Sequence, residues 1–406
     1  MMKAVEENPD LISRADVVVG IPSYNEAATI AVPTQQADKG LSKYFADYSC
    51  VIINCDNNSP DNTREVFMGA PTSNPKIYIS TPDGLRGKGN NLRNLFAKAV
   101  ELEARAVVVV DADLRSITPE WIRNLGQPLF EDFSFVSPLY VRHKYDGTIT
   151  NNIAYPLTRA LYGRRVRQPI GGDFGFSGEL ARSYLESGMW TQDVAEYGID
   201  IWMTSLAMIS RAQVIQSFMG RPKIHKVKEP SEDLGPMFAN VVGTIFDLMC
   251  HNEGFWREVK WSRPTAVFGY GLGDVEIPPE IVVDVSILGE KFLSGAASFR
   301  EVHQACLSDE TFSKLQEASE IPLEAFELPP VLWAKILYDF ALAYKQKTVP
   351  RDVLLNALTP LYYGRALSFV LETETMNNQQ VEEIIEDQCL QFEKCKRYLL
   401  ERWSAR

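Results

Sequence analysis

The sequence predicts an α/β fold with a mostly parallel sheet, followed by a mainly α-helical domain. Continuous apolar runs recur at 17–21, 50–54, 76–80 and 106–110. Helical patterns separate these runs, as expected for parallel strands that helices cover on both faces. From about Leu234 onward the apolar spacing is largely helical.

Each strand of the first half ends in a polar segment. Pro22 and Ser23 close the first run, and a helix is expected to begin near Glu26. The second run ends in a turn over 56–61, and the fourth leads directly into Asp111. Ligands of such sheets bind at the carboxyl ends of the strands, so these segments are the first candidates for a site.

The middle and the last third contain further elements. Strands are expected at 133–140 and 214–218, and a helix is expected over 151–163 despite Pro156. Four helices are then expected, at 331–344, 351–358, 367–371 and 381–400, in a region that prolines at 322, 329, 330, 350 and 360 punctuate. We place one domain boundary near residue 260, which gives a catalytic domain of residues 1–260 and a helical domain of residues 261–406.

Composition and charge exclude several classes of protein. Of 406 residues, 53 are acidic and 41 are Lys or Arg, a net charge of −12, which disfavours nucleic-acid binding. No apolar run approaches the 18 residues of a membrane span, and the first residues lack the apolar core of a signal peptide. The six scattered cysteines form no CxxC pair, so we expect reduced thiols, no zinc site and a cytoplasmic protein with no membrane partner.

The acidic pair in Asp111-Ala112-Asp113 is the first candidate for chemistry. Two carboxylates at a strand end suit Mg²⁺ or Mn²⁺, which bind one or two carboxylates together with substrate phosphates. The same pattern also suits a solvated turn. His225 is a candidate for a further metal ligand, or else a surface histidine in a basic turn; His251, in a helical pattern, is its rival.

A glycine-rich segment at 84–91 is the candidate phosphate site. Glycines let the backbone approach a ligand, and Arg86 and Lys88 supply positive charge. The spacing of a P-loop is absent. The alternative is an exposed loop without a ligand. The segments 22–26 and 56–59 offer short polar side chains for a base and ribose, or for helix caps and Asx turns.

Two further carboxylates and a group of arginines follow. Gly171-Gly172 precedes Asp173 and is expected to aim that carboxylate into a cleft, while Asp200 is expected at the start of a helix over 201–208. Asp200 is either a hydroxyl partner or a helix N-terminal charge. The arginines at 159, 164, 165 and 167 suit an anionic acceptor, or a solvated face.

In this order, the motifs resemble those of retaining GT-A nucleotide-sugar transferases, whose Rossmann-like domain carries the donor. More narrowly, they resemble the group of mannosylglycerate, glucosylglycerate and glucosyl-3-phosphoglycerate synthases. The matching residues lie at 22–26, 86–89, 111–113, 141–143, 168–172, 197–200 and 225.

The resemblance implies a role for each matching residue. Asp113 and His225 would bind Mg²⁺ or Mn²⁺, and Asp111 would bind the metal or the ribose. Lys88, Asp173 and Asp200 would be catalytic, although the family often has Glu where Asp173 stands. The donor-binding set would be Pro22, Ser23, Tyr24, Glu26, Asp56, Arg86, Gly87, Lys88, Asp111, Ala112, Gln168, Gly171 and Gly172. The acceptor-binding set would be Arg142, Thr148, Thr150, Arg159 and Asp200.

The resemblance also implies the substrates. The donor would be a nucleotide-diphosphate hexose, GDP-glucose or GDP-mannose rather than UDP-glucose. The acceptor would be glycerate, because relatives that use 3-phosphoglycerate carry an arginine where Thr148 stands. The product would be a glycosylglycerate compatible solute. Alternatives are 3-phosphoglycerate as acceptor, a nucleotidyltransferase, or a non-catalytic nucleotide-sugar-binding module; a homodimer through the C-terminal helices is a further expectation.

Overall fold

The computed structural model describes residues 5–225, 234–269 and 276–404, and its chain forms two compact units. The first unit takes the described residues of 1–142, 166–227 and 265–278. The second takes those of 143–165, 228–264 and 279–406. The units are therefore interleaved along the chain, whereas the sequence analysis places one boundary near residue 260.

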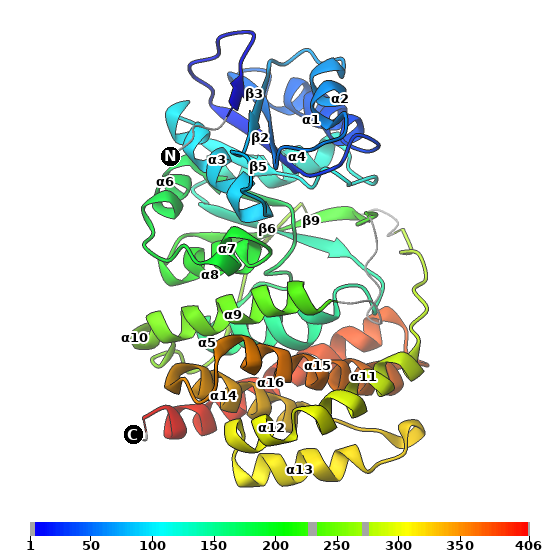
Figure 1. Ribbon diagram of the computed structural model, residues 1–406. Helices are drawn as coiled ribbons and strands as arrows, with labels where there is room; N and C mark the ends of the chain where they lie inside the picture. Colours follow the sequence, from blue (N-terminus) through cyan, green and yellow to red (C-terminus); the bar gives the residue numbers. More distant parts are fainter. Residues whose placement is uncertain (1–4, 226–233, 270–275, 405–406) are drawn as a thin grey trace. The chain divides into compact units, whose positions relative to one another are not determined.

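The first unit is built on a mixed, largely parallel sheet (Figure 1). In spatial order its strands are β1 (Val5–Glu7), β4 (Lys76–Ser80), β3 (Cys50–Asp56), β2 (Val17–Ser23), β5 (Ala106–Val109), β8 (Phe174–Ser177), β6 (Phe135–Val141), β9 (Val214–Pro222) and β11 (Val267–Phe268). Strands β4, β3, β2 and β5 run parallel, and β8 runs antiparallel to both of its neighbours. The predicted α/β class is thus confirmed.

The helices of the first unit cover both faces of this sheet. They are α1 (Ala31–Tyr44), α2 (Thr63–Gly69), α3 (Lys88–Glu101), α4 (Pro119–Gly126), α6 (Gly178–Glu186), α7 (Gln192–Ala195) and α8 (Ile199–Ile209), with a 3₁₀ turn η1 (Gln127–Phe130). The helix expected near Glu26 begins at Ala31, and α3 begins at Lys88, inside the glycine-rich segment.

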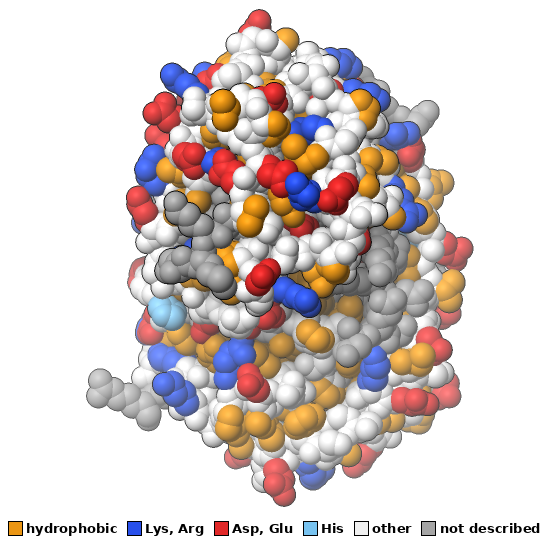
Figure 2. Space-filling model, turned by 45° about the horizontal axis from the view of Figure 1, so that its top comes forward, with side chains coloured by type: hydrophobic (Ala, Val, Ile, Leu, Met, Phe, Trp, Pro, Cys, Tyr) orange, Lys and Arg blue, Asp and Glu red, His pale blue; other side chains and the backbone are white. Residues whose placement is uncertain are grey.

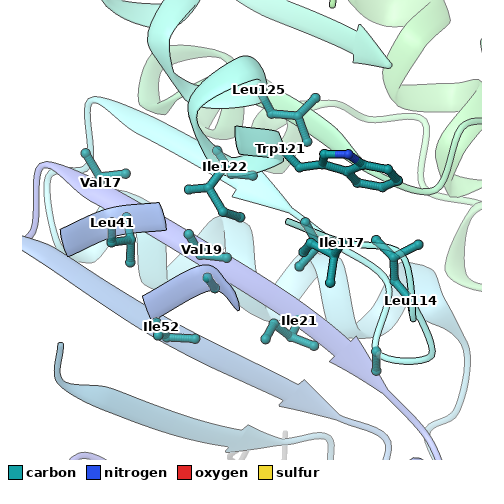
Figure 3. Packing of buried hydrophobic residues seen from close by; sticks show 14 of the residues in the cluster. Val17, Val19, Ile21, Leu41, Ile52, Leu114, Ile117, Trp121, Ile122 and Leu125 are labelled. Atoms are coloured by element: carbon teal, nitrogen blue, oxygen red, sulfur yellow. The ribbon is translucent and has the colours of Figure 1, made fainter. Parts of the chain in front are cut away.

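Side chains of β2 alternate between the two faces of the sheet, and each face packs against different helices. Val17, Val19 and Ile21 belong to one buried cluster with Leu41 of α1 and Trp121 of α4 (Figure 3). On the opposite face, a Cβ added at Gly20 would lie 2.2 Å from a methyl carbon of Leu95 in α3. Successive residues of a strand point to opposite faces, so this central strand is buried on both.

The second unit is mainly helical, as predicted for the end of the chain. Its elements are a π-helical turn η2 (Thr150–Ala154), α5 (Tyr155–Tyr162), α9 (Gly235–His251), α10 (Glu253–Trp256), α11 (Val285–Ser298), α12 (Arg300–Cys306), α13 (Asp309–Ser319), η3 (Leu323–Ala325), α14 (Pro330–Gln346), α15 (Arg351–Thr373) and α16 (Asn378–Ser404), with a small sheet of β7 (Arg164–Arg165) and β10 (Arg263–Pro264). The helix expected over 151–163 forms as η2 followed directly by α5, and Pro156 lies just after the π-helical turn, a local irregularity that accommodates the missing backbone N–H of a proline.

One expectation for this unit is wrong. The separate helices predicted at 351–358 and 367–371 are a single helix, α15, with Pro360 inside it. Pro360 lacks the N–H that would donate to the carbonyl of Asn356, so the helix loses one backbone hydrogen bond there. Burial of most of its residues lets the helix continue through the proline.

The surface and the cysteines agree with the composition. Within the part of the chain that the structure describes, no helix is long and apolar enough to cross a membrane. No disulfide forms among the described residues, which include all six cysteines. Basic and acidic side chains of the described residues are interspersed on the face drawn in Figure 2. The cytoplasmic location and the homodimer stay predictions.

Candidate active site at the strand ends

The carboxyl ends of β2, β3 and β5 bring several predicted site residues to one edge of the sheet. Ser23 is the last residue of β2 and pairs in register with Asp56, the last residue of β3. Asp111 follows β5, which runs parallel to β2. Lys88 begins α3, whose other end is Glu101. The predicted placement of these polar residues at strand ends is therefore confirmed.

Lys88 lies between two of the predicted carboxylates. Its Nζ donates to Asp111 Oδ1 at 3.0 Å and lies 3.3 Å from Asp200 Oδ1. Burial alone would lower the pKa of Lys88, but Asp111 and Asp200 raise that pKa above its ordinary value. The ammonium therefore stays charged, and its side chain is 20% exposed, so an anionic ligand can reach it.

Lys223 is a member of this site that the sequence analysis missed. It follows β9, and its Nζ donates to Asp111 Oδ2 at 2.8 Å and to Asp173 Oδ2 at 3.0 Å. Burial would raise the pKa of Asp111, yet Lys223 and Lys88 together lower it well below its ordinary value. The one signal in the sequence is its position two residues before His225. We call Lys88, Asp111, Asp173, Asp200 and Lys223 the carboxylate–lysine cluster.

Asp173 does not face a cleft, in contrast to the expectation from its Gly-Gly turn. Its side chain is fully buried. Its Oδ1 accepts a hydrogen bond from the backbone N–H of Asp111 at 2.8 Å, and the Tyr140 hydroxyl donates to its Oδ2. Burial raises the pKa of Asp173, and Lys223 opposes that rise. The antiparallel strand β8 begins immediately after Asp173, so the carboxylate lies at the end of the sheet rather than in an open loop.

Gly87 shows why the segment before α3 is rich in glycine. Its φ is +116°, which L-residues with a side chain rarely adopt. A Cβ there would lie 2.3 Å from the carbonyl oxygen of Ala195 in α7. The glycine thus lets the segment that carries Asp200 approach the start of α3, and this approach places Lys88 beside Asp200.

Asp113 and His225 lie on adjacent segments. The Arg115 N–H donates to Ile224 O at 2.8 Å, and the Ile224 N–H donates to the Ser116 hydroxyl at 2.9 Å. Among the described residues no three His, Cys, Asp or Glu side chains gather as a metal site. Two protein ligands, one carboxylate and one imidazole, fit a Mg²⁺ or Mn²⁺ ion that a diphosphate completes. Asp111 is already bound by two ammonium groups.

The other predicted donor residues are divided between exposed and buried positions. Asp56 is fully buried and accepts from the Ser23 hydroxyl at 2.6 Å and the Tyr78 hydroxyl at 3.1 Å. By contrast, Arg86 is exposed, and its guanidinium lies over the ring of Tyr24, 5.1 Å from the ring centroid. The buried members of the predicted donor set are Pro22, Ser23, Asp56, Ala112, Gln168, Gly171 and Gly172, and the partly or fully exposed members are Tyr24, Glu26, Arg86, Gly87, Lys88 and Asp111.

The predicted acceptor residues do not gather in one unit. Arg142 belongs to the first unit, where its guanidinium lies 5.1 Å from the ring centroid of Tyr140. Thr148, Thr150 and Arg159 are buried in the second unit. There the Thr148 hydroxyl shares a 2.6 Å hydrogen bond with Tyr362, and Arg159 forms ion pairs with carboxylates of α16. Their predicted contact with an acceptor stays a prediction.

Part of the chain is similar to one known protein family. Residues 18–185 match the family described as Glycosyl transferase family 2. No curated protein matches the chain.

Solved structures of glucosyl-3-phosphoglycerate synthase from Mycobacterium tuberculosis are also similar. Its complex with phosphoglyceric acid is 23% identical, with 57% of this chain and 79% of that chain covered and a TM-score of 0.44. Its complex with Mn²⁺, UDP and glucosyl-3-phosphoglycerate is 22% identical, with 57% and 80% covered and a TM-score of 0.43. Its complex with Mg²⁺ and UDP is 23% identical, with 57% and 79% covered and a TM-score of 0.44.

The family match contains three of the five residues of the carboxylate–lysine cluster, namely Lys88, Asp111 and Asp173. It also contains Asp113, the second acidic residue of the strand-end pair. The match of residues 18–185 agrees with the glycosyltransferase that the ordered motifs predict.

Proposed function

We propose that this protein is a retaining, metal-dependent hexosyltransferase that moves glucose or mannose from a nucleotide-diphosphate sugar to a glycerate-type acceptor. The observation that carries the proposal is the position of Lys88, which is charged, partly exposed and lies between Asp111 and Asp200 at the strand ends. An ammonium in this position suits a diphosphate leaving group. The family match of residues 18–185 supports the same reaction class.

On the donor side, Lys88 binds the diphosphate and stabilises the negative charge that develops as the hexose leaves. Asp113 and His225 would hold Mg²⁺ or Mn²⁺, which when bound neutralises phosphate oxygens. The exposed Arg86 guanidinium and the partly exposed Tyr24 ring, which lie over one another, offer a surface for the nucleobase. Asp56, being buried and fully engaged in hydrogen bonds, orders the ends of β2 and β3 beneath that surface.

On the acceptor side, Asp200 accepts a hydrogen bond from a substrate hydroxyl other than the one that attacks and so orients the substrate, and Arg142 pairs with the acceptor carboxylate. The side chain of Asp200 is 13% exposed. The hydroxyl oxygen forms the new bond to the anomeric carbon on the face from which the diphosphate departs. The bond from that carbon to the phosphate oxygen breaks, and this oxygen takes the hydroxyl proton. The anomeric configuration is retained, and no strongly basic side chain is needed.

The proposed acceptor is free glycerate and the proposed donor is GDP-linked. The choice of acceptor rests on Thr148, which replaces the arginine of relatives that use 3-phosphoglycerate. In the structure the Thr148 hydroxyl is engaged with Tyr362 inside the second unit. A phosphorylated acceptor would therefore need a second cation for its phosphate, because Arg142 pairs with the acceptor carboxylate.

A matrix of donors and acceptors tests the function. GDP-glucose, GDP-mannose and UDP-glucose are each combined with D-glycerate and 3-phosphoglycerate in Mn²⁺, and the product anomer is assigned by NMR. We expect an α-linked glycosylglycerate and free nucleoside diphosphate from at least one GDP-sugar. If no donor–acceptor pair gave a glycoside, the proposed transferase activity would be refuted. Release of pyrophosphate from a nucleoside triphosphate and a sugar phosphate would establish the nucleotidyltransferase instead.

The metal assignment has a separate test. Asp113→Asn and His225→Gln are expected to raise the Mn²⁺ concentration needed for half-maximal activity by at least about tenfold, because each variant removes or weakens one of two protein ligands. The Glu120→Gln variant, which changes an exposed carboxylate paired with Lys43, is the control and should leave that concentration unchanged. Full activity of Asp113→Asn in the presence of a chelator would contradict the assignment.

A further inference from the structure

Lys223 is a buried ammonium with no function assigned by the proposed reaction. Its side chain is 3% exposed. Its Nζ donates to Asp111 Oδ2 at 2.8 Å, to Asp173 Oδ2 at 3.0 Å and to the backbone carbonyl of Gly171 at 2.8 Å. An ammonium group has three N–H donors, and these three acceptors use all of them. Lys223 therefore has no donor left for a substrate, and any effect on catalysis passes through its partners.

The charges around Lys223 indicate what that effect is. Asp111 and Asp173 lie so close that the Asp111 N–H donates to Asp173 Oδ1 at 2.8 Å. Two adjacent, buried carboxylates repel each other unless a cation lies between them. Lys223 bridges them on one side, which leaves Asp111 Oδ1 to Lys88. Without Lys223, Lys88 would be the remaining ammonium in the carboxylate–lysine cluster and would be drawn away from Asp200.

Gly172 gives independent evidence that the backbone is shaped around this ion pair. Its φ is +85°. A Cβ at this position would lie 2.3 Å from Asp111 Oδ2 and 2.7 Å from Lys223 Nζ. The carbonyl of Gly172 also accepts a hydrogen bond from Lys88 Nζ at 3.3 Å. The same turn thus contacts both lysines, and any side chain there would separate Asp111 from Lys223.

We propose that Lys223 is a positioning residue of the hexosyl transfer: it holds Asp111, Asp173 and the Gly171–Gly172 turn so that Lys88 meets both Asp111 and Asp200. This inference rests on the proposed function. Lys223 sets the geometry in which Lys88 receives the departing diphosphate, without touching the substrate itself. Its loss is expected to slow the chemical step more than it weakens donor binding.

The test compares Lys223→Met with Lys223→Arg and with a matched control. Lys98, at the other end of α3, also pairs with two carboxylates and has a side chain that is 5% exposed, so Lys98→Met reports the effect of removing a similar ion pair outside the site. We expect Lys223→Met to lower kcat by about 10²-fold, as misplaced catalytic groups do, with a donor KM within about threefold of wild type. Lys98→Met should keep the wild-type kcat, and Lys223→Arg should recover part of the lost kcat.

Gly172→Ala is the second variant, and it decides the outcome if Lys223→Met does not fold. It retains both lysines but pushes Asp111 and Lys223 apart, so kcat should fall. Because a side chain at a φ of +85° is strained, the unfolding temperature of this variant is measured first, and kcat is compared well below that temperature. The double variant should lose no more kcat than the more affected single variant, since both changes disrupt one ion pair. A wild-type kcat in folded Lys223→Met, or in Gly172→Ala, would overturn this inference alone. Absence of turnover in the wild-type protein would overturn the proposed function and this inference with it.

Discussion

Three buried or half-buried lysines of this protein differ in what surrounds the ammonium. Lys88 and Lys223 meet carboxylates, which keep them charged beside the proposed diphosphate site. Among the residues that the structure describes, the hydrogen-bond acceptors of Lys396 in α16 are backbone carbonyls, those of Ala160, Trp256 and Val259, at 2.5–2.9 Å. Their contacts therefore indicate three different roles: catalytic for Lys88, positioning for Lys223 and structural for Lys396.

Lys88→Met is expected to lower kcat by about 10²- to 10³-fold, because it removes a positive charge aimed at the leaving group. The measurement is steady-state kinetics with the best donor and acceptor of the matrix. Lys98→Met again serves as the control, since Lys98 also lies on α3 between two carboxylates. A Lys88→Met variant with a kcat within twofold of wild type would rule out contact between Lys88 and the leaving group.

The burial of Lys396 leads us to expect that the free energy of unfolding rises at alkaline pH. Burial lowers its pKa from 10.5 to about 8 in the folded protein. Between these two values the unfolded chain binds more protons than the folded one, so the free energy of unfolding increases with pH from about 8 to 10.5. Below pH 8 both states carry the proton, and this contribution does not change.

Denaturant unfolding of wild type and Lys396→Met at several pH values from 7 to 10.5 checks this prediction. The wild-type protein should gain stability relative to the variant over that range, because Met carries no titrating group. A difference between the two proteins that stays constant with pH would show that Lys396 has an ordinary pKa in the folded state.

At the scale of elements, α15 shows how packing overrides a local breaker. Pro360 predicts an interruption, and the sequence analysis accordingly expects two short helices. The structure has one helix of 23 residues, most of whose residues are buried. Tertiary burial contributes more to the stability of a helix than local propensity does, so the helix persists through the proline.

Contact between α11 and α15 gives a prediction about Gly295. Gly→Ala inside a helix usually stabilises by up to about 1 kcal/mol. A Cβ at Gly295, however, would lie 2.2 Å from both Cβ and Cγ of Pro360, whose ring is rigid. We expect Gly295→Ala to lower the free energy of unfolding by about 1–3 kcal/mol.

Gly254→Ala in α10 is the matched control, because nothing lies within 4 Å of the added Cβ. Its stability should change by less than about 1 kcal/mol. Both variants are compared by denaturant unfolding. If Gly295→Ala proved as stable as the control, the prediction would be wrong, and α11 and α15 would be able to move apart locally at little cost in free energy.

At the scale of the whole molecule, the chain crosses between its two units several times. The second unit contains α5 and α9 in addition to the helices after residue 279. Every residue of α5 is buried, and Arg159 of α5 pairs with Glu386 and Glu393 of α16. The helical unit is therefore assembled from three stretches of sequence.

A chain truncated after residue 260 is expected to fold poorly, although the sequence analysis places a boundary there. It would retain α5 and α9 without α11–α16, and so expose their apolar surfaces. We expect strong binding of a hydrophobic dye and broad thermal unfolding, both reversed by co-expression of residues 261–406. A truncated chain that is monodisperse and unfolds cooperatively would instead support a single boundary at residue 260.

The sequence by itself determined the α/β class, the central strands and the strand-end position of Asp111, because apolar periodicity and turn residues are local signals. It also indicated Lys88, through the glycines around it. Only the tertiary structure decided that Lys223 joins Asp111 across 112 positions of the chain and that Asp173 is buried beside it. Such contacts depend on strand order and on the crossover connections between strands, which no local period encodes. For the same reason, the burial of Thr148 and Arg159 in the helical unit could not be read from the residues around them.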